Sequence, residues 1–357
     1  MEEDFSNKDV SGQTEADYTD HFIEASNNER DEKYSPREEK QALSDHEKAE
    51  VFQNAIEEGI NDALALIKER FEDSLEEKDR LEFHNRKHTE GVVRRATAIL
   101  DTIREIDPSL VSDRAYNVGR FTAAYHDTTQ KWEPQVIPST TPGEEGLFKI
   151  MRKRFGGQNE EESTQDAIDA MDKVNKGAGT EIFTDDDKTM VRAGHEATIP
   201  GFNPEIGTVV QTKLNKESSI ITRATALGDL GTAGMDGPEE FLAEGDALFR
   251  EENLDIADAM NNRDSLSPQY KEFCRKRMLG WSQFQEKFAS GRKTLLDEEL
   301  RPLPDHVREQ VKEKHFNKFD ASIAAAVERA QKRAGMSFEE IAEDMGYELG
   351  DTTKVVY

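Results

Sequence analysis

The stretch "EFHNRKHTEG", residues 82–91, places two of the chain's eight histidines four positions apart. Residues at that spacing lie on one face of a helix, so His84 and His88 would be close enough to share a ligand or a metal ion. The segment that follows, to about residue 106, keeps apolar residues at helical spacing. The stretch therefore predicts a helix that carries both histidines near its beginning.

The charge of the chain restricts its partners. Its 357 residues include 75 acidic and 47 basic side chains, which give a formal net charge of -28. Such a field repels phosphate backbones, and the sequence has no long run of Lys and Arg, so we expect no nucleic-acid partner. An acidic protein can still act on a phosphorylated small molecule if metal cations supply the local positive charge.

Cysteine use and hydropathy favour a cytoplasmic protein that does not span or bind a membrane. Cys274 is the only cysteine, which excludes an intrachain disulfide and any zinc cluster built from cysteines. The first residues, "MEEDFSNKDV", have neither a basic region nor an apolar region of the kind found in signal peptides. No apolar run approaches the ~18 residues that a membrane span needs.

Composition changes sharply after the first part of the chain. Residues 1–42 are polar and acidic and cannot bury enough apolar surface to offset ordering entropy, which predicts a disordered tail. From the capping-box sequence "SDHE" at Ser44 onward, helical patterns dominate, and Thr184 with Asp187 predicts another helix start. Further helical patterns cover approximately residues 86–106, 111–126, 144–155, 160–174, 185–197, 212–231, 238–260, 266–290 and 304–333. Alternating strand patterns are almost absent, and "IPSTTPGEEG" and "IPGFNPEIG" are interpreted as loops, so the expected fold class is all-α.

Three further polar residues or pairs fall at the ends of apolar helical patterns or inside them. "FTAAYHDTTQ" ends a helix with His126 and Asp127, and an adjacent imidazole and carboxylate can ligate metal ions together. "MVRAGHEATIP" places His195 at the end of another apolar helix. "IITRATALGDLGTAG" places Asp229 inside an apolar run, where an unpaired carboxylate would be costly and a metal would satisfy it.

Each of these features also fits ordinary structure when taken alone. A His-Asp dipeptide arises by chance, and two histidines at helical spacing can both face solvent. Asp229 could cap a break in its helix, since Gly228 and Gly231 flank it. The joint occurrence of the features in this order is what favours a metal site.

That order resembles the HD-domain metal-dependent phosphohydrolase superfamily, whose members are all-α. The form "HNRKH" is similar to an H-N-x-x-H signature within it, and the following His-Asp pair and late Asp-Leu pair at 229–230 match as well. "GGQNEEESTQDAIDAM" supplies the N-E-x-x-S stretch, at 159–163, of a group of small bacterial HD phosphohydrolases. The resemblance covers roughly residues 80–250. It implies an HD-domain core over residues 43–260, followed by a C-terminal helical extension over 261–357.

The resemblance also implies roles for individual residues. The metal ligands would be His88, His126, Asp127 and Asp229. His84 would stand beside the metal as the general acid, because an imidazole with a pKa near ~6.5 can protonate a leaving alkoxide at neutral pH. Glu160 would act as an orienting residue or a base, and His195 would belong to the site wall or hold a second metal.

Departures from the related patterns leave the substrate open. Cyclic-nucleotide enzymes of this superfamily carry another histidine three residues after the His-Asp pair, where this chain has Gln130. Signalling HD domains have a lysine at that place and a later Gly-Tyr-Pro, and here Lys131 is one position away and no such tripeptide occurs. Cyclic-nucleotide and cyclic-dinucleotide specificity are therefore not expected.

The expected function is hydrolysis of a phosphate ester of a small molecule, most plausibly a nucleotide, by a metal-activated water with His84 as acid. One or two divalent ions (Mn, Mg, Zn, Fe, Co or Ni) would be required. One alternative is a catalytically silent HD fold that binds a metal or nucleotide in a regulatory role. Another is a di-iron oxygenase, which needs about six His and Asp ligands, whereas this chain offers five at most.

The C-terminal region adds an aromatic stripe whose members are Tyr270, Phe273, Trp281, Phe284 and Phe288. A stripe at helical spacing is more often core than a cofactor site. It would either pack on the helical domain or form the interface of a homodimer.

Overall fold

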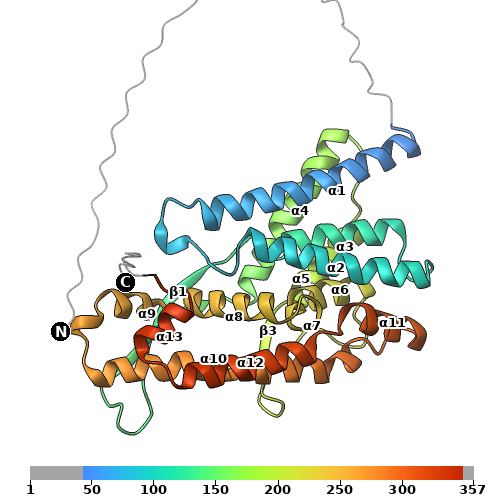
Figure 1. The fold of residues 1–357 in the computed structure, drawn as a ribbon. Helices are drawn as coiled ribbons and strands as arrows, with labels where there is room; N and C mark the ends of the chain where they lie inside the picture. The colour runs from blue at the N-terminus through green and yellow to red at the C-terminus, as the bar shows by residue number, and fades with distance from the viewer. Residues whose placement is uncertain (1–42, 349–357) are drawn as a thin grey trace, which may run out of the picture. The chain divides into compact units, whose positions relative to one another are not determined.

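The computed structural model describes residues 43–348, so the predicted disordered tail, residues 1–42, lies outside it. The described residues contain thirteen α-helices and two short antiparallel hairpins (Figure 1). The expected helical fold class is thereby confirmed in its general form. No helix in this part of the chain is both long and apolar enough to cross a membrane.

The α-helices are α1 (Asp45–Ile67), α2 (Arg86–Ile106), α3 (Asp113–Tyr125), α4 (Gln158–Ala178), α5 (Asp185–Glu196), α6 (Ile220–Asp229), α7 (Thr232–Met235), α8 (Pro238–Glu252), α9 (Leu254–Asn261), α10 (Pro268–Glu299), α11 (Asp305–His315), α12 (Phe319–Ala334) and α13 (Phe338–Asp344). The strands are β1 (Trp132–Pro138), β2 (Phe148–Arg154), β3 (Pro200–Asn203) and β4 (Thr208–Gln211). A π-helical turn (Lys68–Glu72) and two 3-10 turns (Glu77–Asp79 and Arg263–Ser265) complete the helical elements.

Local side chains determine where several helices begin. At the start of α1, the Ser44 hydroxyl accepts a hydrogen bond from the Glu47 backbone nitrogen at 3.3 Å, and the Glu47 carboxylate accepts one from the Ser44 nitrogen at 2.7 Å. Thr184 and Asp187 make the same reciprocal pair at the start of α5. Each pair satisfies two backbone donors that the first helical turn would otherwise leave free. Both predicted caps are confirmed.

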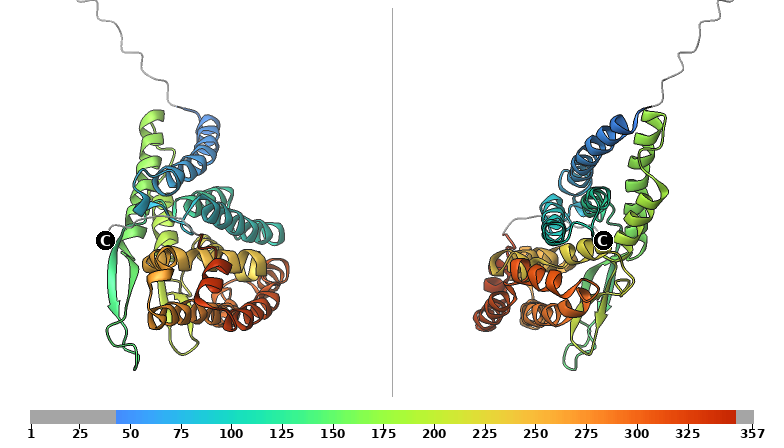
Figure 2. Two further views of the ribbon diagram at one scale, coloured as in Figure 1. Left: turned by 60° about the vertical axis from the view of Figure 1, so that its left-hand side comes forward. Right: turned by 90° about the vertical axis from the view of Figure 1, so that its right-hand side faces the viewer.

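Helices α2 and α3 lie side by side and connect two hydrophobic clusters (Figures 1 and 2). One cluster joins α2 and α6 to α8, α10, α11 and α12, and the other joins α3 to α1, α4 and α5. A third cluster lies between α8, α9, α10 and α13. As far as it is described, the predicted extension from residue 261 therefore shares its core with the helices that precede it.

Gly228 allows α6 to approach α2 closely. A side-chain carbon at this position would lie 3.1 Å from both the Ala96 backbone nitrogen and the Val92 carbonyl oxygen. The fully buried Arg95 holds the contact by donating from Nε to the Gly228 carbonyl at 2.6 Å. Because Asp229 is the next residue and ends α6, this contact fixes its carboxylate near the beginning of α2.

The helix predicted for residues 144–155 is wrong, because this segment contains β2 of a hairpin with β1. Its sequence "FKIMRKR" is rich in long side chains of good helix propensity, which explains the error. The strand is held instead by seven register pairs with β1 and by a bridge from Met151 to Asn253, between α8 and α9. Such tertiary pairing overrides local preference. Similarly, "IPGFNPEIG" contains β3 rather than being loop throughout.

Four of the predicted helices also differ in extent from the observed ones. The pattern over 304–333 is divided into α11 and α12 by residues 316–318, and the pattern over 266–290 continues to Glu299 in α10. The pattern over 212–231 becomes a helix only from Ile220, because the residues before it form β4 and turns. The pattern over 238–260 is divided at Asn253 into α8 and α9. The break places the last residues of α8 next to β2, beside the candidate site.

Candidate metal centre

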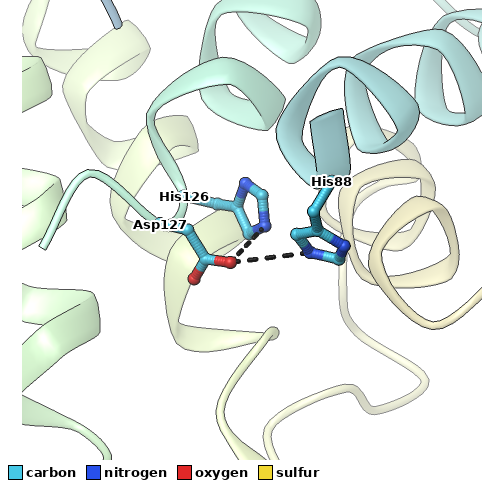
Figure 3. Close-up of side chains that lie close together, drawn as sticks. All are labelled: His88, His126 and Asp127. Atoms are coloured by element: carbon cyan, nitrogen blue, oxygen red, sulfur yellow. Dashed lines mark ion pairs between the residues drawn. The ribbon is translucent and has the colours of Figure 1, made fainter. Parts of the chain in front are cut away.

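Three of the predicted ligands lie at helix ends that face each other. Asn85 caps α2 by accepting a hydrogen bond from the His88 backbone nitrogen at 3.1 Å, which places His88 in the first turn. Helix α3 ends at Tyr125, with His126 as its C-cap residue and Asp127 next. Figure 3 shows the three side chains pointing toward one another. Asp127 Oδ2 lies 3.0 Å from His126 Nε2 and 3.6 Å from His88 Nε2.

Asp229, at the end of α6, brings the fourth predicted ligand to the same place. Its Oδ1 lies 3.4 Å from His88 Nε2 and 3.9 Å from His126 Nε2. Two imidazole nitrogens and two carboxylate oxygens therefore converge from three helix ends. Mixed nitrogen and oxygen donors of this kind suit Zn, Mn, Fe, Co or Ni ions.

The histidine nitrogens at this centre are free to bind an ion. His126 Nδ1 donates to the Ala123 carbonyl at 2.8 Å, which leaves a lone pair on Nε2 directed into the cluster. His126 Nε2 and His88 Nε2 are buried, and their partners among residues 43–348 are the carboxylates of Asp127 and Asp229, which lie 3.0–3.9 Å away. A cation could take the place of the proton in such a histidine–carboxylate pair, so these nitrogens satisfy the first requirement of a ligand set.

Two glutamines orient the carboxylates. Gln130 Nε2 donates to Asp127 Oδ1 at 2.7 Å, so the other oxygen of that carboxylate faces the histidines. Gln211, on β4, lies 3.5 Å from Asp229 Oδ2 in the same way and donates to the Ala226 carbonyl at 2.7 Å. Neighbours that hold the second oxygen of a ligand are typical of metal sites. Gln130 thus takes a supporting position beside Asp127.

The charges in the cluster shift the pKa values of two of its groups in opposite directions. Burial favours the neutral form of His126, but the Asp127 and Asp229 carboxylates outweigh it and raise the pKa of His126 to about 9. Burial would likewise raise the pKa of Asp127, but the neighbouring histidines, His126 foremost, hold it well below its usual range. The carboxylate is therefore ionised and ready to accept a cation in place of the imidazole proton.

A cavity of about 270 Å³ opens beside the centre. Its polar end is lined by Asp127 and Asp229 from the centre, and by His84, Glu160 and Arg154 around it. Of all the lining residues, each within the described part of the chain, Arg154 is the single lysine or arginine. Its Nε is buried and has no hydrogen-bond partner there. Arg154 therefore offers a donor to an anion that enters from the cavity.

His84 is held at both ring nitrogens. Nδ1 pairs with the Glu251 carboxylate at the end of α8, and that carboxylate also accepts from the backbone nitrogens of Phe83 at 2.8 Å and His84 at 3.1 Å. Nε2 lies 2.6 Å from Arg154 Nη1. Because arginine can only donate, Nε2 accepts, and the ring proton lies on Nδ1 toward Glu251. Burial opposes ionisation of Glu251, but His84 and neighbouring arginines lower its pKa to about 2.

The N-E-x-x-S stretch fixes the loop that follows Asp127. Asn159 accepts from the Lys131 backbone nitrogen at 2.9 Å and donates to its carbonyl at 3.1 Å. Ser163 accepts from the Thr129 backbone nitrogen at 3.0 Å. These bonds tie the end of α3 to the first turns of α4, which explains why these residue types occur together with the His-Asp pair.

Glu160 lines the cavity but also caps α4. Its Oε2 accepts from the Gly157 backbone nitrogen at 2.5 Å, and the side chain is 6% exposed. Within the described part of the chain the carboxylate bonds to the start of α4 and not to the histidines or aspartates of the centre, so its geometry supports a capping and wall role.

His195 does not point a free nitrogen at the centre. Its Nε2 lies 3.0 Å from the Thr122 carbonyl and its Nδ1 lies 3.0 Å from Thr164 Oγ1. The ring is fully buried, and this burial lowers the pKa of His195 to about 4. Both nitrogens therefore bond to the protein, and we leave His195 out of the proposed ligand set.

Sequence reasoning missed Arg154 and Glu251. Arg154 lies in the segment that was expected to be helical. In a strand Arg152 and Arg154 lie on the same face, but in a helix residues two positions apart do not, so the prediction gave no reason to consider them together. Glu251 is 167 residues from His84, and nothing in "FREENLD" distinguishes it from its acidic neighbours. The strand assignment for β2 would have been the available signal for the arginine.

A comparison of the chain with protein families, curated proteins and solved structures finds no match. The resemblance to HD-domain phosphohydrolases thus depends on the motif residues and their geometry alone.

Proposed function

We propose that the protein is a metal-dependent phosphohydrolase that cleaves a phosphate ester of a small molecule, most plausibly a nucleotide. The observation that carries this proposal is the cluster of His88, His126 and Asp127, whose donor atoms lie within 4.8 Å of one another beside a cavity. Asp229 Oδ1 supports it from α6, 3.4 Å from His88 Nε2 and 3.9 Å from His126 Nε2. When bound, a divalent ion would polarise phosphoryl oxygens and lower the pKa of a coordinated water from 15.7 toward ~7.

Arg154 would bind the phosphoryl group. A guanidinium donates to phosphate oxygens in a planar, charge-assisted geometry, and this residue lines the cavity and has one buried N–H without a partner among the described residues. It would also provide the positive charge that the rest of the polar end lacks. In an acidic protein this single cation is well placed to stabilise the charge that develops during phosphoryl transfer.

His84 would donate the proton to the leaving oxygen after Arg154 moves. In the arrangement described, Nε2 accepts from Arg154 and carries no proton. A phosphoryl group that draws the guanidinium away would free this nitrogen to take up a proton from solvent, and Glu251 at Nδ1 would stabilise the doubly protonated ring, which can then give the Nε2 proton to the leaving oxygen. Glu251 acts here as a positioning residue, since it also fixes the backbone of His84. A positioned acid of this kind typically contributes a factor of about 10²–10⁴ to the rate.

The oxygenase alternative loses support from the geometry. Its expected ligand number of about six exceeds the four side chains that converge, because both nitrogens of His195 are engaged elsewhere. Iron content together with oxygen consumption would restore it.

The test is elemental analysis of the purified protein beside its Asp127→Ala variant, with phosphate release measured on the same samples. We expect the parent to contain a divalent metal and to release phosphate, and the variant to lose both. Asp186→Ala removes an exposed carboxylate from the first turn of α5 and serves as the matched control, with metal and activity retained. A metal-replete parent that hydrolyses no phosphate ester would contradict the proposal and favour a regulatory role.

A further inference from the structure

Helix α10 presents an aromatic face to the far end of the cavity. Trp281, Phe284, Gln285 and Phe288 line it, and their spacing places them on one side of the helix. The ring centroids of Trp281 and Phe284 are 5.6 Å apart, and those of Phe284 and Phe288 are 6.3 Å apart. The aromatic stripe of the sequence is therefore divided. Phe273 lies inside a hydrophobic cluster, whereas Trp281 packs against the same cluster and also lines the cavity.

Neighbouring elements hold this wall rigidly. Phe241 of α8 stacks on Phe288 with centroids 6.0 Å apart and an interplanar angle of 15°. The Trp281 indole donates to the Gly245 carbonyl at 2.8 Å, which fixes its orientation. Rings that are fixed before a ligand arrives lose little entropy on binding, so the wall is suited to receive a flat group.

Gln285 places one polar group in the wall. The residue is 6% exposed and lines the cavity. The position depends on Gly245, since a side-chain carbon there would lie 2.7 Å from Gln285 Oε1. A carboxamide offers both donor and acceptor atoms, so this side chain can form hydrogen bonds with the edge of a ligand in the cavity.

The charge along the cavity restricts the phosphate end of a ligand. Five carboxylates line it, and they belong to Asp127, Glu160, Asp229, Glu244 and Glu252. Arg154 alone among the lining lysines and arginines opposes them. Such a surface repels a di- or triphosphate group, but it can accept a single phosphate that lies between the Arg154 guanidinium and a metal ion. The volume of about 270 Å³ is at the small end for ligand pockets, which favours a ligand with a single base.

We propose that the aromatic end of this cavity binds the base of a nucleoside monophosphate, with the ring stacked against Trp281 and Phe284 and its edge bonded to Gln285. The inference rests on the proposed function for the position of the phosphate, which lies at the metal centre beside Arg154. Helix α10 belongs to the region beyond the HD resemblance, so specificity comes from the C-terminal part of the chain.

Nucleosides test the base subsite without hydrolysis, because they carry no phosphate. The chain has two tryptophans, so Trp132→Phe leaves Trp281 as its only indole fluorophore. We expect at least one of the four common ribonucleosides to quench this fluorescence saturably, while ribose leaves it unchanged. Calorimetric titration of the same protein gives the dissociation constant independently of the fluorophore.

Two wall variants and one control variant decide the role of the wall. Gln285→Leu and Phe284→Leu should each weaken nucleoside binding at least tenfold, and Gln283→Leu, an exposed glutamine on the same helix, should change it less than twofold. Circular dichroism checks that each variant is folded. If no nucleoside binds, or if both wall variants bind as tightly as the parent, the inference is overturned.

Phosphate release separates this inference from the proposed function. The parent protein should hydrolyse nucleoside monophosphates with a kcat/KM at least tenfold above that for ribose 5-phosphate or ATP. Equal efficiency on ribose 5-phosphate would reject the base subsite and leave the hydrolase intact. Nucleoside binding at Trp281 without release of phosphate from any ester would reject the hydrolase and leave the subsite.

Discussion

Replacing His195 should change how the protein's stability depends on pH. Burial lowers the pKa of His195 to about 4, from an ordinary value of 6.5. Between these two values the unfolded chain binds a proton that the folded chain does not, so this group destabilises the fold as pH falls from 6.5 toward 4. At pH 5 the difference amounts to about 2 kcal/mol, from the two titration curves with 1.36 kcal/mol per pKa unit.

The assay is urea denaturation of the parent and of His195→Asn at pH 7 and at pH 5. The variant loses packing at both values, so the comparison uses each protein's own change between the two pH values. We expect the parent to lose about 2 kcal/mol more than the variant over this interval. Equal losses would refute the reasoning. Metal content should be the same in both proteins, and its disappearance in His195→Asn would instead show that this histidine acts as a ligand.

Three further substitutions test the site. Arg154→Ala should lower kcat/KM by at least a hundredfold without changing metal content, while Lys153→Ala, on the exposed face of the same strand, should leave both within twofold. Glu251→Gln should lower kcat by about 10²–10⁴-fold with little effect on KM, as expected for loss of the positioned acid, and an unchanged kcat would exclude that role. Gly228→Ala should destabilise the fold by about 1–3 kcal/mol, measured by denaturation. It should also weaken metal binding because α6 shifts, and metal titration measures that effect. Gly177→Ala in α4, where a side-chain carbon meets nothing within 4 Å, is its control and should be neutral or stabilising.

The sequence predicted the helices that have strong local determinants. The Ser44 and Thr184 caps are visible within four residues of chain, and the apolar spacing of α2 or α3 repeats over several turns. The same local information failed at β2, because that strand is stabilised by β1 and by a contact with Asn253 a hundred residues later. Elements whose stability comes from distant partners leave little trace in their own composition.

The sequence predicted the candidate site in part, as it did the helices. The order of the motifs predicted His88, His126, Asp127 and Asp229 as ligands. In the structure the first three form one close group, and Asp229 lies beside the two histidines. The sequence did not predict the groups that support the site, because Glu251 contacts His84 only through the packing of α8. Local spacing also could not divide the aromatic stripe of α10 into core and cavity wall, because one face of a long helix meets different neighbours along its length.

The Nδ1 atom of His88 also weakens the fold that holds it. His88 is 2% exposed and this nitrogen has no partner among the described residues, and a buried polar atom without a partner costs about 1–3 kcal/mol. An apolar side chain of similar size at His88 would fill the same space without that penalty. At this position, stability and the proposed role as a ligand therefore favour different side chains.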